Sequence, residues 1–396
     1  MVGRADEPLP DAADAVIVGG GVVGVAAARD LAPDYDVVVV EKGAVAGEAS
    51  ALAAGEVTLA TTYIGEREGI AEYGTSFFRD YSGTGDFHYE ERNGVELVPQ
   101  GRGGEAREYA AGLRDTGANV EYIDPPTGRE RYPRIDFDRF DGGIEFRDTG
   151  FLDPYTFATT LADDAEDRGA TICTERAVTG LVVENGTVTG VETEGGRIDA
   201  DHVVAAAGWR TTSFLAEHLE IPVQPYRTQC IVLEPDDPVG EDFPMGWLPG
   251  EHVYFRPELN GDVLVGGFSF AEDDPERASG QADEAFRQHV AELLPRFVEG
   301  GDRARFVNGW AGVDGATPDT LPIIDAPDAA PDGLVVAAGF HGRGVMTAPI
   351  AAAIVNALVR DTTPPFTRDP FRLDRFEDTS PDFEFTSISA GDDDYD

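Results

Sequence analysis

Three glycines near the start of the chain have the spacing of a phosphate-binding turn. Gly19, Gly21 and Gly24 form the pattern GxGxxG. In this pattern the first glycine allows a tight turn, the second lets a pyrophosphate approach the backbone, and the third lets a helix and a strand pack closely. Glu41 follows about 20 residues after the first glycine, where a carboxylate accepts hydrogen bonds from a ribose hydroxyl. A turn that only packs would leave Glu41 without a role, so these residues predict dinucleotide binding.

The segments around the turn would position it correctly. Residues 15–18 are an apolar run typical of a buried parallel strand, and 25–31 continue beyond the glycines as a helix. Residues 37–40 are all valine and form a second buried strand that ends at Glu41. The first backbone N–H groups of the helix are then free for phosphate oxygens. This unit predicts an α/β protein with a Rossmann-like domain.

The rest of the chain is too long for one ordinary core, so we expect two domains in its 396 residues. Three segments are predicted to be mainly helical and two to be strand-rich: 62–92, 102–115 and 281–294 for the helices, 171–206 and 223–270 for the strands. The tail at 377–396 is acidic, contains Ser and Thr without periodicity, and is expected to be disordered.

The charge balance excludes some partners. The chain has 75 acidic residues against 30 Lys and Arg, for a net charge of −45. Nucleic acid and anionic membranes would be repelled by such a field. Lys42 is the sole lysine. We interpret this acid-rich, lysine-poor composition as adaptation to a salt-loaded cytoplasm, where self-repulsion is screened within about 3 Å. A GC-rich genome would explain the missing lysines but not the excess of acids.

Other features favour a cytoplasmic protein without metal. Cys173 and Cys230 have no CxxC spacing and no histidine cluster nearby, so we predict two buried free thiols and no metal site. The acidic start of the chain has no apolar signal region, and no apolar run is long enough to span a membrane.

Which dinucleotide is bound is indicated by a resemblance. The sequence resembles the FAD-dependent amine and amino-acid oxidoreductases, the family of D-amino acid dehydrogenase, glycine oxidase, sarcosine oxidase and dimethylglycine dehydrogenase. The resemblance covers nearly the whole chain, and the order and spacing of its blocks are more specific than any one block. The blocks are VIVGGGVVGVAAARDLA at 16–32, VVVVEKG at 37–43, EASALAAG at 48–55, DTGFLDP at 148–154, ADHVVAAAGW at 200–209, VYFRPELNGDVLVGG at 253–267, WAGVDGATPDTLPII at 310–324, GLVVAAGFHGRGVMTAPI at 333–350 and FRLDRF at 371–376.

The family layout implies a discontinuous FAD-binding domain and a substrate domain with a mixed or antiparallel sheet. The implied segments are 12–85, 145–222 and 315–376 for FAD, and 86–144 and 223–314 for substrate. Carried over to this sequence, the resemblance also implies the residues that contact FAD along its length. They are Gly19, Gly21, Val22, Val23, Gly24, Glu41, Lys42, Ser50, Ala54, Gly55, Val178, Ala207, Gly208, Trp209, Gly339, His341, Gly342, Gly344, Val345 and Met346.

Several positions depart from the family's patterns. Leu52 and Gly312 stand where relatives carry the His or Cys that binds flavin covalently, so we expect non-covalent FAD. Val265 stands where the sarcosine oxidase branch places a lysine that promotes reaction with dioxygen. This favours a dehydrogenase with another electron acceptor, although His341 or an arginine could supply the positive charge instead.

The substrate residues depart as well. Asp314 stands where glycine oxidase-like members hold the substrate carboxylate with an arginine, and Met346 replaces a second cationic clamp. The remaining catalytic candidates are Tyr254, Arg256, His341 and Arg343, because an arginine fork suits a carboxylate. Ion pairing at a sheet edge or at a rim is the alternative for the two arginines, and a flavin contact is favoured over a base for His341.

The sequence leaves alternatives for the substrate class and for the residues of the pocket wall. Asp314 would also suit a cationic or polyamine-like substrate. Trp310, Phe255 and Tyr226 are candidates for an apolar pocket wall, with a core position as the alternative for each.

The resemblance implies oxidation of the C–N bond of a small amino acid or N-methylated amino acid. Hydride would pass to flavin N5, and the imine would hydrolyse. Two alternatives stay open: an oxidoreductase for another small substrate, such as a hydroxy acid or a cationic amine, and a flavin-bearing assembly factor or subunit without its own turnover. The electron acceptor and the choice between homo- and hetero-oligomer are not determined.

Overall fold

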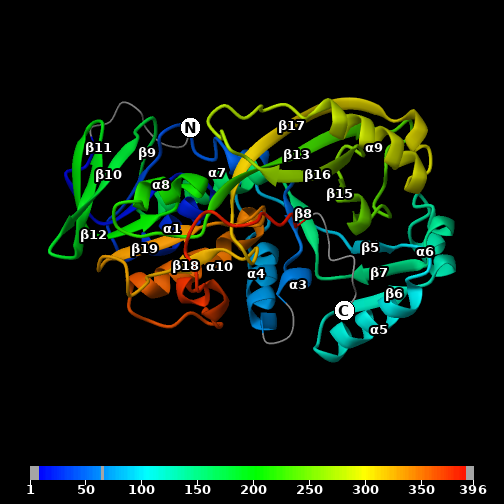
Figure 1. Ribbon diagram of the computed structural model, residues 1–396, viewed down its shortest axis with the longest axis horizontal. Helices are drawn as coiled ribbons and strands as arrows, with labels where there is room; N and C mark the ends of the chain where they lie inside the picture. Colours follow the sequence, from blue (N-terminus) through cyan, green and yellow to red (C-terminus); the bar gives the residue numbers. More distant parts are fainter. Residues whose placement is uncertain (1–8, 64–66, 389–396) are drawn as a thin grey trace.

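A computed structural model describes residues 9–63 and 67–388. Three β-sheets with helices around them make up this part of the chain (Figure 1). Sheet A, with the N-terminal strand, occupies one side of the molecule, and sheet C occupies the other. The architecture confirms the predicted α/β class with a second, mixed sheet.

Sheet A contains the strands predicted around the glycine turn. Its path is β10 (Val178–Glu184), β11 (Thr187–Thr193), β12 (Gly196–Ala205), β1 (Ala12–Val18), β2 (Val37–Val40) and β9 (Thr171–Cys173), and β12 also pairs with β19 (Leu334–Ala338), which pairs with β18 (Ile323–Asp325). The central pairs β12–β1, β1–β2, β2–β9 and β12–β19 are parallel. The carboxyl ends of these strands therefore meet at one edge of the sheet, where ligands bind in such folds.

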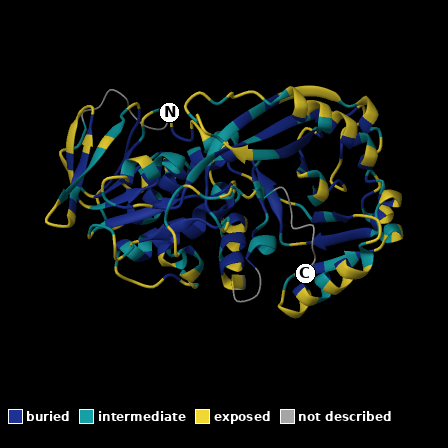
Figure 2. Cartoon of the chain, viewed as in Figure 1, coloured by how far each residue is buried: buried dark blue, intermediate teal, exposed yellow. Residues whose placement is uncertain are grey.

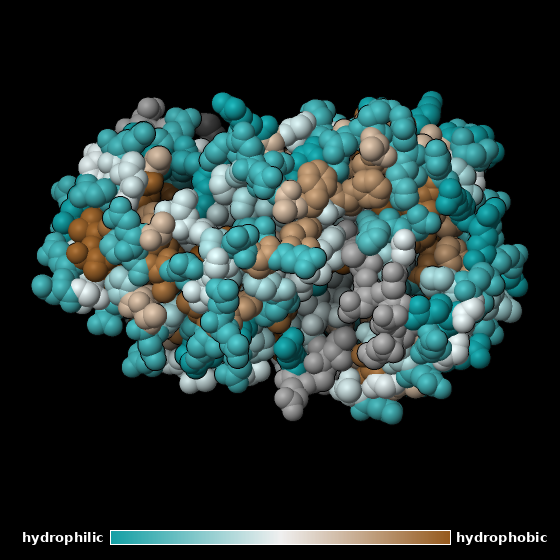
Figure 3. All heavy atoms as spheres, viewed as in Figure 1, coloured by the Kyte–Doolittle hydropathy of each residue, from teal (hydrophilic) through white to brown (hydrophobic). Residues whose placement is uncertain are grey.

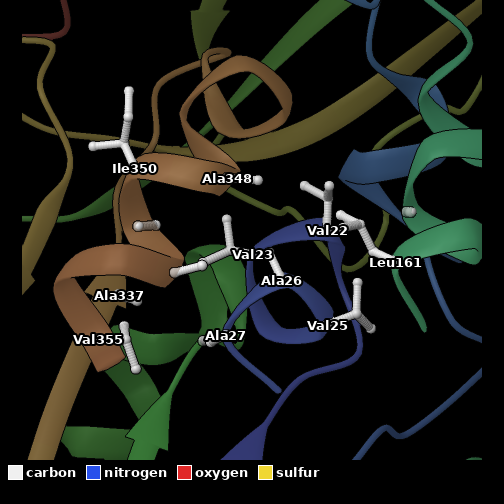
Figure 4. Close-up of a cluster of buried hydrophobic side chains, with 14 of the residues drawn as sticks. Val22, Val23, Val25, Ala26, Ala27, Leu161, Ala337, Ala348, Ile350 and Val355 are labelled. Atoms are coloured by element: carbon white, nitrogen blue, oxygen red, sulfur yellow. The ribbon is translucent and has the colours of Figure 1, made fainter. Parts of the chain in front are cut away.

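Three helices cover the inner strands of sheet A: α1 (Val22–Leu31), α7 (Pro154–Asp167) and α10 (Gly344–Val359). In Figure 4, Val23 and Ala26 of α1 lie between side chains of α10, such as Ile350, and Leu161 of α7. Alanines and valines on α1 let these helices approach closely. The buried cluster holds the start of α1, and so the glycine turn, in place.

Sheet C is the second layer and is mixed. Its order is β17 (Arg305–Ala316), β13 (Gln224–Glu234), β16 (Val263–Ala271), β15 (Val253–Pro257), β14 (Met245–Leu248), β5 (Gly94–Val98), β7 (Gly142–Phe146) and β6 (Val120–Ile123). Only β14–β5 is parallel among its pairs in the described residues. Helix α9 (Glu284–Phe297) packs on it through Phe286 and Phe297. Helix α5 (Gly103–Asp115) packs on its other end through Ala106 and Ala110.

The third sheet, sheet B, is small, and its three strands come from segments that alternate along the chain with strands of sheets A and C. It consists of β3 (Glu56–Val57), β8 (Gly150–Leu152) and β4 (Tyr89–Glu91). The remaining helices are α2 (Ala49–Leu52), α3 (Leu59–Thr62), α4 (Glu68–Tyr81), α6 (Pro125–Arg131) and α8 (Thr211–Leu215). The helix predicted within 62–92 thus ends at Tyr81, because Gly83 and Gly85 adopt positive φ and lead into β4.

The segment 377–388 corrects the expectation of a disordered tail. The Phe383 carbonyl accepts a 2.7 Å hydrogen bond from Gln224, and the Phe385 ring stacks on Tyr226 at 5.2 Å. Aromatic side chains give this acidic segment apolar surface to bury, which its charge pattern conceals. The last part of the predicted tail, 389–396, lies outside the described residues.

Hydrophilic side chains cover most of the visible surface, whereas most residues of the inner strands are buried. Figure 2 shows buried residues concentrated in sheets A and C and exposed residues on the hairpin β10–β11 and on the outer helices. In Figure 3 hydrophilic side chains cover most of the visible face. Within residues 9–63 and 67–388, no helix has the length and apolar character needed to cross a membrane.

Candidate functional site

A cavity of about 660 Å³ is lined by residues of both large sheets. We call one part the dinucleotide end; its lining includes Gly19, Gly21, Glu41, Val178 and Gly208. We call the other part the chamber end; its lining includes Glu56, Trp247, Tyr254, Asp314 and Arg343. The volume is within the range of sites for small molecules and cofactors. One cavity thus joins the glycine turn to sheet C.

The glycine turn has the geometry that the motif requires. Gly19 has a φ of +112°, and a Cβ there would lie 2.4 Å from the Ala206 carbonyl oxygen. A Cβ on Gly24 would lie 2.0 Å from the Gly19 carbonyl oxygen. This close contact lets helix α1 pack against the turn. Gly24 is not among the residues that line the cavity. Gly21 immediately precedes α1, and it lines the cavity together with Val22 and Val23, so the start of the helix faces the space where phosphate oxygens would lie.

Glu41 and Ser50 hold the backbone around this turn. The Glu41 carboxylate accepts the Gly20 N–H and the Gly43 N–H, each at 2.7 Å. The Ser50 hydroxyl accepts the Val22 N–H at 3.0 Å. A carboxylate has about four acceptor positions, so Glu41 retains capacity for ribose hydroxyls. The residues therefore fit an adenine dinucleotide.

Charged residues form a network on the same side of the cavity. The Lys42 ammonium and the Arg210 guanidinium each lie 2.6 Å from a different oxygen of Glu48. Arg210 also pairs with Glu276 at 2.9 Å and lies 4.0 Å over the Trp209 ring. Lys42, the sole lysine, is thus engaged at the dinucleotide end and does not reach the chamber end.

Most predicted site residues line the cavity. They are Gly19, Gly21, Val22, Val23, Glu41, Lys42, Ser50, Ala54, Gly55, Val178, Ala207, Gly208, Trp209, Tyr254, Gly342, Arg343, Gly344, Val345 and Met346. Four are not in the lining: Gly24, Arg256, Gly339 and His341.

His341 is turned away from the cavity. It is fully buried, its Nδ1 accepts the Thr317 N–H at 3.3 Å, and its Nε2 lies 2.8 Å from the Thr386 carbonyl oxygen. The ring also stacks on Phe385. Burial lowers the pKa of His341 to about 4, so the ring is neutral and donates from Nε2. The predicted catalytic or flavin-contacting role of His341 is therefore replaced by anchoring of the segment 377–388.

Arg256 is also engaged elsewhere. Its Nε donates to the Ala54 carbonyl at 2.5 Å, and its Nη1 donates to the Pro257 carbonyl at 3.0 Å. Its Nη2 lies 3.2 Å from Glu258. The guanidinium is buried and supports the loop that carries Ala54, so it does not serve as the carboxylate clamp that the sequence suggested.

Arg343 and Tyr254 do line the chamber end. Arg343 Nη1 donates to the Thr320 carbonyl at 2.6 Å and lies 3.0 Å from its hydroxyl. Burial lowers the pKa of Arg343, which nevertheless stays protonated at neutral pH. The Tyr254 hydroxyl lies 3.7 Å from the Cys230 thiol. Of the two arginine candidates for binding an anionic group, Arg343 lines the cavity and Arg256 does not.

The structure resolves the alternatives for the other chamber positions. Tyr226 lines the cavity, whereas Phe255 lies in the core of sheet C. Trp310 donates from its indole to the Leu52 carbonyl at 2.8 Å and is not part of the lining. Asp314 accepts the Gly342 N–H at 2.8 Å, and burial raises its pKa. Asp314 therefore holds the loop before α10.

Sequence reasoning missed Glu56. This residue directly follows the Ala54-Gly55 pair and forms β3, and its side chain lines the cavity beside sheet C. Its Oε1 is buried without a hydrogen-bond partner among the described residues, and burial raises the pKa of Glu56 to about 8. Its position at the end of a resembling block was the signal that could have singled it out.

Three positions bear on covalent attachment of flavin and on its reaction with dioxygen. Leu52 and Gly312 both line the cavity, and a Cβ on Gly312 would lie 3.1 Å from the Leu52 Cβ. Neither position offers a nucleophilic side chain. Val265 is buried in the core of sheet C, so its side chain is not part of the cavity lining.

Comparisons with known proteins agree with this geometry. The chain is 29% identical to sarcosine oxidase subunit beta of Rhizobium meliloti (strain 1021), over 94% of this chain and 90% of that protein. A match to glycine oxidase of Pseudomonas putida is 31% identical and spans only about half of each chain, 47% of this one and 49% of that one. The fold is similar to that of L-proline dehydrogenase from P. horikoshii, with a TM-score of 0.83 at 22% identity over 93% of this chain and 99% of that one. The family model described as FAD dependent oxidoreductase matches residues 14–358. The chain therefore belongs to the FAD-dependent oxidoreductase family.

Proposed function

We propose that the protein oxidises the C–N bond of a small amino acid or N-methylated amino acid and that the imine product hydrolyses in water. The observation that carries this proposal is the single cavity that joins the dinucleotide end to the chamber end. Its relatives named glycine oxidase and sarcosine oxidase subunit beta support the substrate class.

The residues of the chain would bind and orient the reactants. The glycine turn and the start of α1 bind the pyrophosphate, and Glu41 binds the ribose. FAD, when bound, accepts at N5 the hydride that leaves the substrate carbon. Arg343 binds the substrate carboxylate, and the aromatic side chains of Trp247 and Tyr254 exclude water from the chamber end.

The start of helix α10 would stabilise negative charge on a bound flavin. Its N-terminus begins at Gly344, and Gly342, Gly344 and Val345 line the cavity. A helix N-terminus carries a partial positive charge and free N–H groups, which stabilise negative charge. Asp314 keeps this loop in place through its bond to Gly342.

The proposal includes non-covalent FAD and an acceptor other than dioxygen. Leu52 and Gly312 offer no atom for a covalent bond to flavin. No lysine is available at the chamber end, because Lys42 is the only one in the chain and pairs with Glu48. Denaturation should therefore release FAD, and reduced protein should be reoxidised slowly by air.

A second candidate function is that of a subunit in a larger enzyme. The relative named sarcosine oxidase subunit beta is the observation that favours it. This version predicts that flavin is bound but that small amines reduce it only when partner chains, which copurify at high salt, are present.

The test is anaerobic visible absorbance of protein purified in molar KCl. Glycine, sarcosine, dimethylglycine, proline, D-amino acids and hydroxy acids are added one at a time. We expect one class to bleach the flavin, and admission of air then measures the rate of reoxidation. Bleaching by hydroxy acids alone would contradict amine oxidation. Bound flavin that no compound bleaches would favour the subunit, and absence of flavin would contradict the whole proposal.

A further inference from the structure

Glu56 lines the cavity at the chamber end, and one of its carboxyl oxygens has no hydrogen-bond partner among the described residues. It lies on the two-residue strand β3, immediately after the Ala54-Gly55 pair. Its Oε1 is buried and has no hydrogen-bond partner in the described part of the chain, although its side chain lines the cavity. A buried polar atom without a partner is costly and rare in a native protein. Such an atom in a cavity wall indicates a group that a ligand completes.

The nearest cation does not complete it. Arg256 faces Glu56 and favours its ionised form, but the Arg256 donors go to the carbonyls of Ala54 and Pro257 and to the Glu258 carboxylate. Trp247 also favours the ionised form of Glu56, yet Oε1 has no hydrogen-bond partner among the described residues. The ligand that completes Glu56 must therefore bring a positive charge or a donor of its own.

The walls around Glu56 suit a cation. Glu96 and Asp314 also line the cavity, and Arg343, which lines it too, would pair with the substrate carboxylate. Several aromatic rings line the cavity on the side of sheet C. They are Tyr109, Phe146, Tyr226, Trp247 and Tyr254. Aromatic faces and carboxyl groups together favour ammonium ions over neutral groups of the same shape.

We propose that Glu56 binds the ammonium group of the substrate and accepts its proton. This inference rests on the proposed function, and it makes the substrate class a protonated primary or secondary amine. In the step, an N–H bond of the ammonium breaks and an O–H bond forms on the Glu56 carboxylate. The electron pair of the broken bond stays on nitrogen, so the amine becomes neutral. That lone pair is what allows hydride to leave the neighbouring carbon as the C=N bond forms.

The surroundings set the direction of a pH effect. Burial raises the pKa of Glu56 to about 8 against the opposing effect of Arg256 and Trp247. The other titratable groups that face it, Tyr254 and Cys230, are neutral because burial raises the pKa of both. Above about pH 8 the carboxylate is ionised, and below it the group is protonated and cannot attract a cation. Affinity for a cation should therefore increase as the pH rises through this value.

The test uses fixed positive charges on nitrogens that carry no proton and no lone pair. Betaine is paired with its carbon isostere 3,3-dimethylbutanoate, and choline with 3,3-dimethylbutan-1-ol; within each pair only the charge differs. Kd is measured on FAD-loaded protein by the change in flavin absorbance or by calorimetry at pH 7 and pH 9 in molar KCl. The ionised fraction of a group with this pKa rises about tenfold over that interval, so the preference for the cation should rise about tenfold.

Two variants assign the effect. Glu56→Gln keeps the size of the side chain but removes the charge, and it should lose the pH-dependent preference. Glu258→Gln removes the other carboxylate beside Arg256, which does not line the cavity, and it should keep the preference. The same preference in wild type at both pH values, no binding of either cation, or persistence of the pH effect in Glu56→Gln would overturn the assignment.

This experiment separates Glu56 from the proposed function. Quaternary nitrogen has no lone pair to release, so the binding result does not depend on turnover. A pH-dependent cation preference in a protein that oxidises no amine would support the Glu56 site and contradict the proposed reaction. Amine oxidation without that preference would support the reaction and contradict the Glu56 site. The comparison in wild type alone is sufficient even where a variant fails to fold.

Discussion

The two ends of the cavity satisfy their polar groups in opposite ways. At the dinucleotide end, Glu41 accepts two backbone N–H groups and Ser50 accepts a third. At the chamber end, one Glu56 oxygen is buried without a partner in residues 9–63 and 67–388, and burial raises the pKa of both Glu56 and Asp314. The first end is organised before any ligand arrives, and the second keeps a capacity that a ligand fills. Substitutions should therefore affect folding and FAD at one end and substrate selectivity at the other.

The largest effect is expected from Gly19→Val. The new side chain would need a φ of +112° and would meet the Ala206 carbonyl at 2.4 Å, so the backbone must move. We expect a loss of about 3 kcal/mol or more in the free energy of unfolding and loss of bound FAD. Denaturant unfolding and the flavin content of purified protein measure both. Gly112→Ala in α5, where a Cβ meets nothing within 4 Å, is the control and should not destabilise. Retention of FAD in Gly19→Val would contradict the assignment of the turn.

Arg343→Gln should mainly affect the substrate. Removal of a buried charge that binds a carboxylate is expected to lower kcat/KM by about 100-fold for amino acids and much less for amines without a carboxylate. Steady-state kinetics with sarcosine and N-methylated amines measure this difference. Arg256→Gln is the comparison, because Arg256 is bonded to the Ala54 carbonyl outside the cavity lining. We expect Arg256→Gln to lower Tm and to change kcat/KM by the same factor for amino acids and for amines without a carboxylate. A selective loss of kcat/KM for amino acids in Arg256→Gln, and not in Arg343→Gln, would indicate that Arg256 binds the carboxylate.

Glu41→Gln should have a smaller effect, confined to the cofactor. The amide loses the charge and places an N–H₂ group against one of the N–H groups of Gly20 and Gly43. We expect FAD affinity to fall about tenfold, with substrate selectivity unchanged. The FAD affinity is measured as the Kd for FAD after reconstitution of the apoprotein. A change in the cation preference of the chamber end would show that the two ends are coupled more strongly than we propose.

An effect that appears only at acidic pH concerns His341, which belongs to neither end. Its pKa is about 4 in the folded protein, whereas an unfolded histidine titrates near about 6.5. The unfolded chain therefore binds more protons between these values, and stability should fall as the pH decreases from about 6.5 to 4, by about 1 kcal/mol per pH unit. The difference in unfolding free energy between wild type and His341→Gln, followed over this range, isolates the contribution. An identical pH dependence in both proteins would contradict the buried, neutral ring.

The sequence by itself determined the dinucleotide end. Gly19, Gly24 and Glu41 could be assigned from spacing because their roles depend on local backbone geometry, where a Cβ has no room and a strand ends in an acid. The Rossmann-like unit followed from the same local pattern, and the resemblance of ordered blocks extended it to FAD and to the mixed second sheet. The prediction of helix over 62–92 missed strand β4, because Gly83 and Gly85 adopt positive φ after the helix ends at Tyr81.

Only the tertiary structure decided the chamber end. Arg256, Arg343 and His341 look alike as candidates in the sequence, but one supports a loop, one lines the cavity and one anchors the segment 377–388. Glu56 carries no motif of its own. Its character comes from Trp247 and Arg256, which are distant in the chain and are brought beside it by sheet C. Burial and partners set the charge state of a side chain, and long-range packing supplies both.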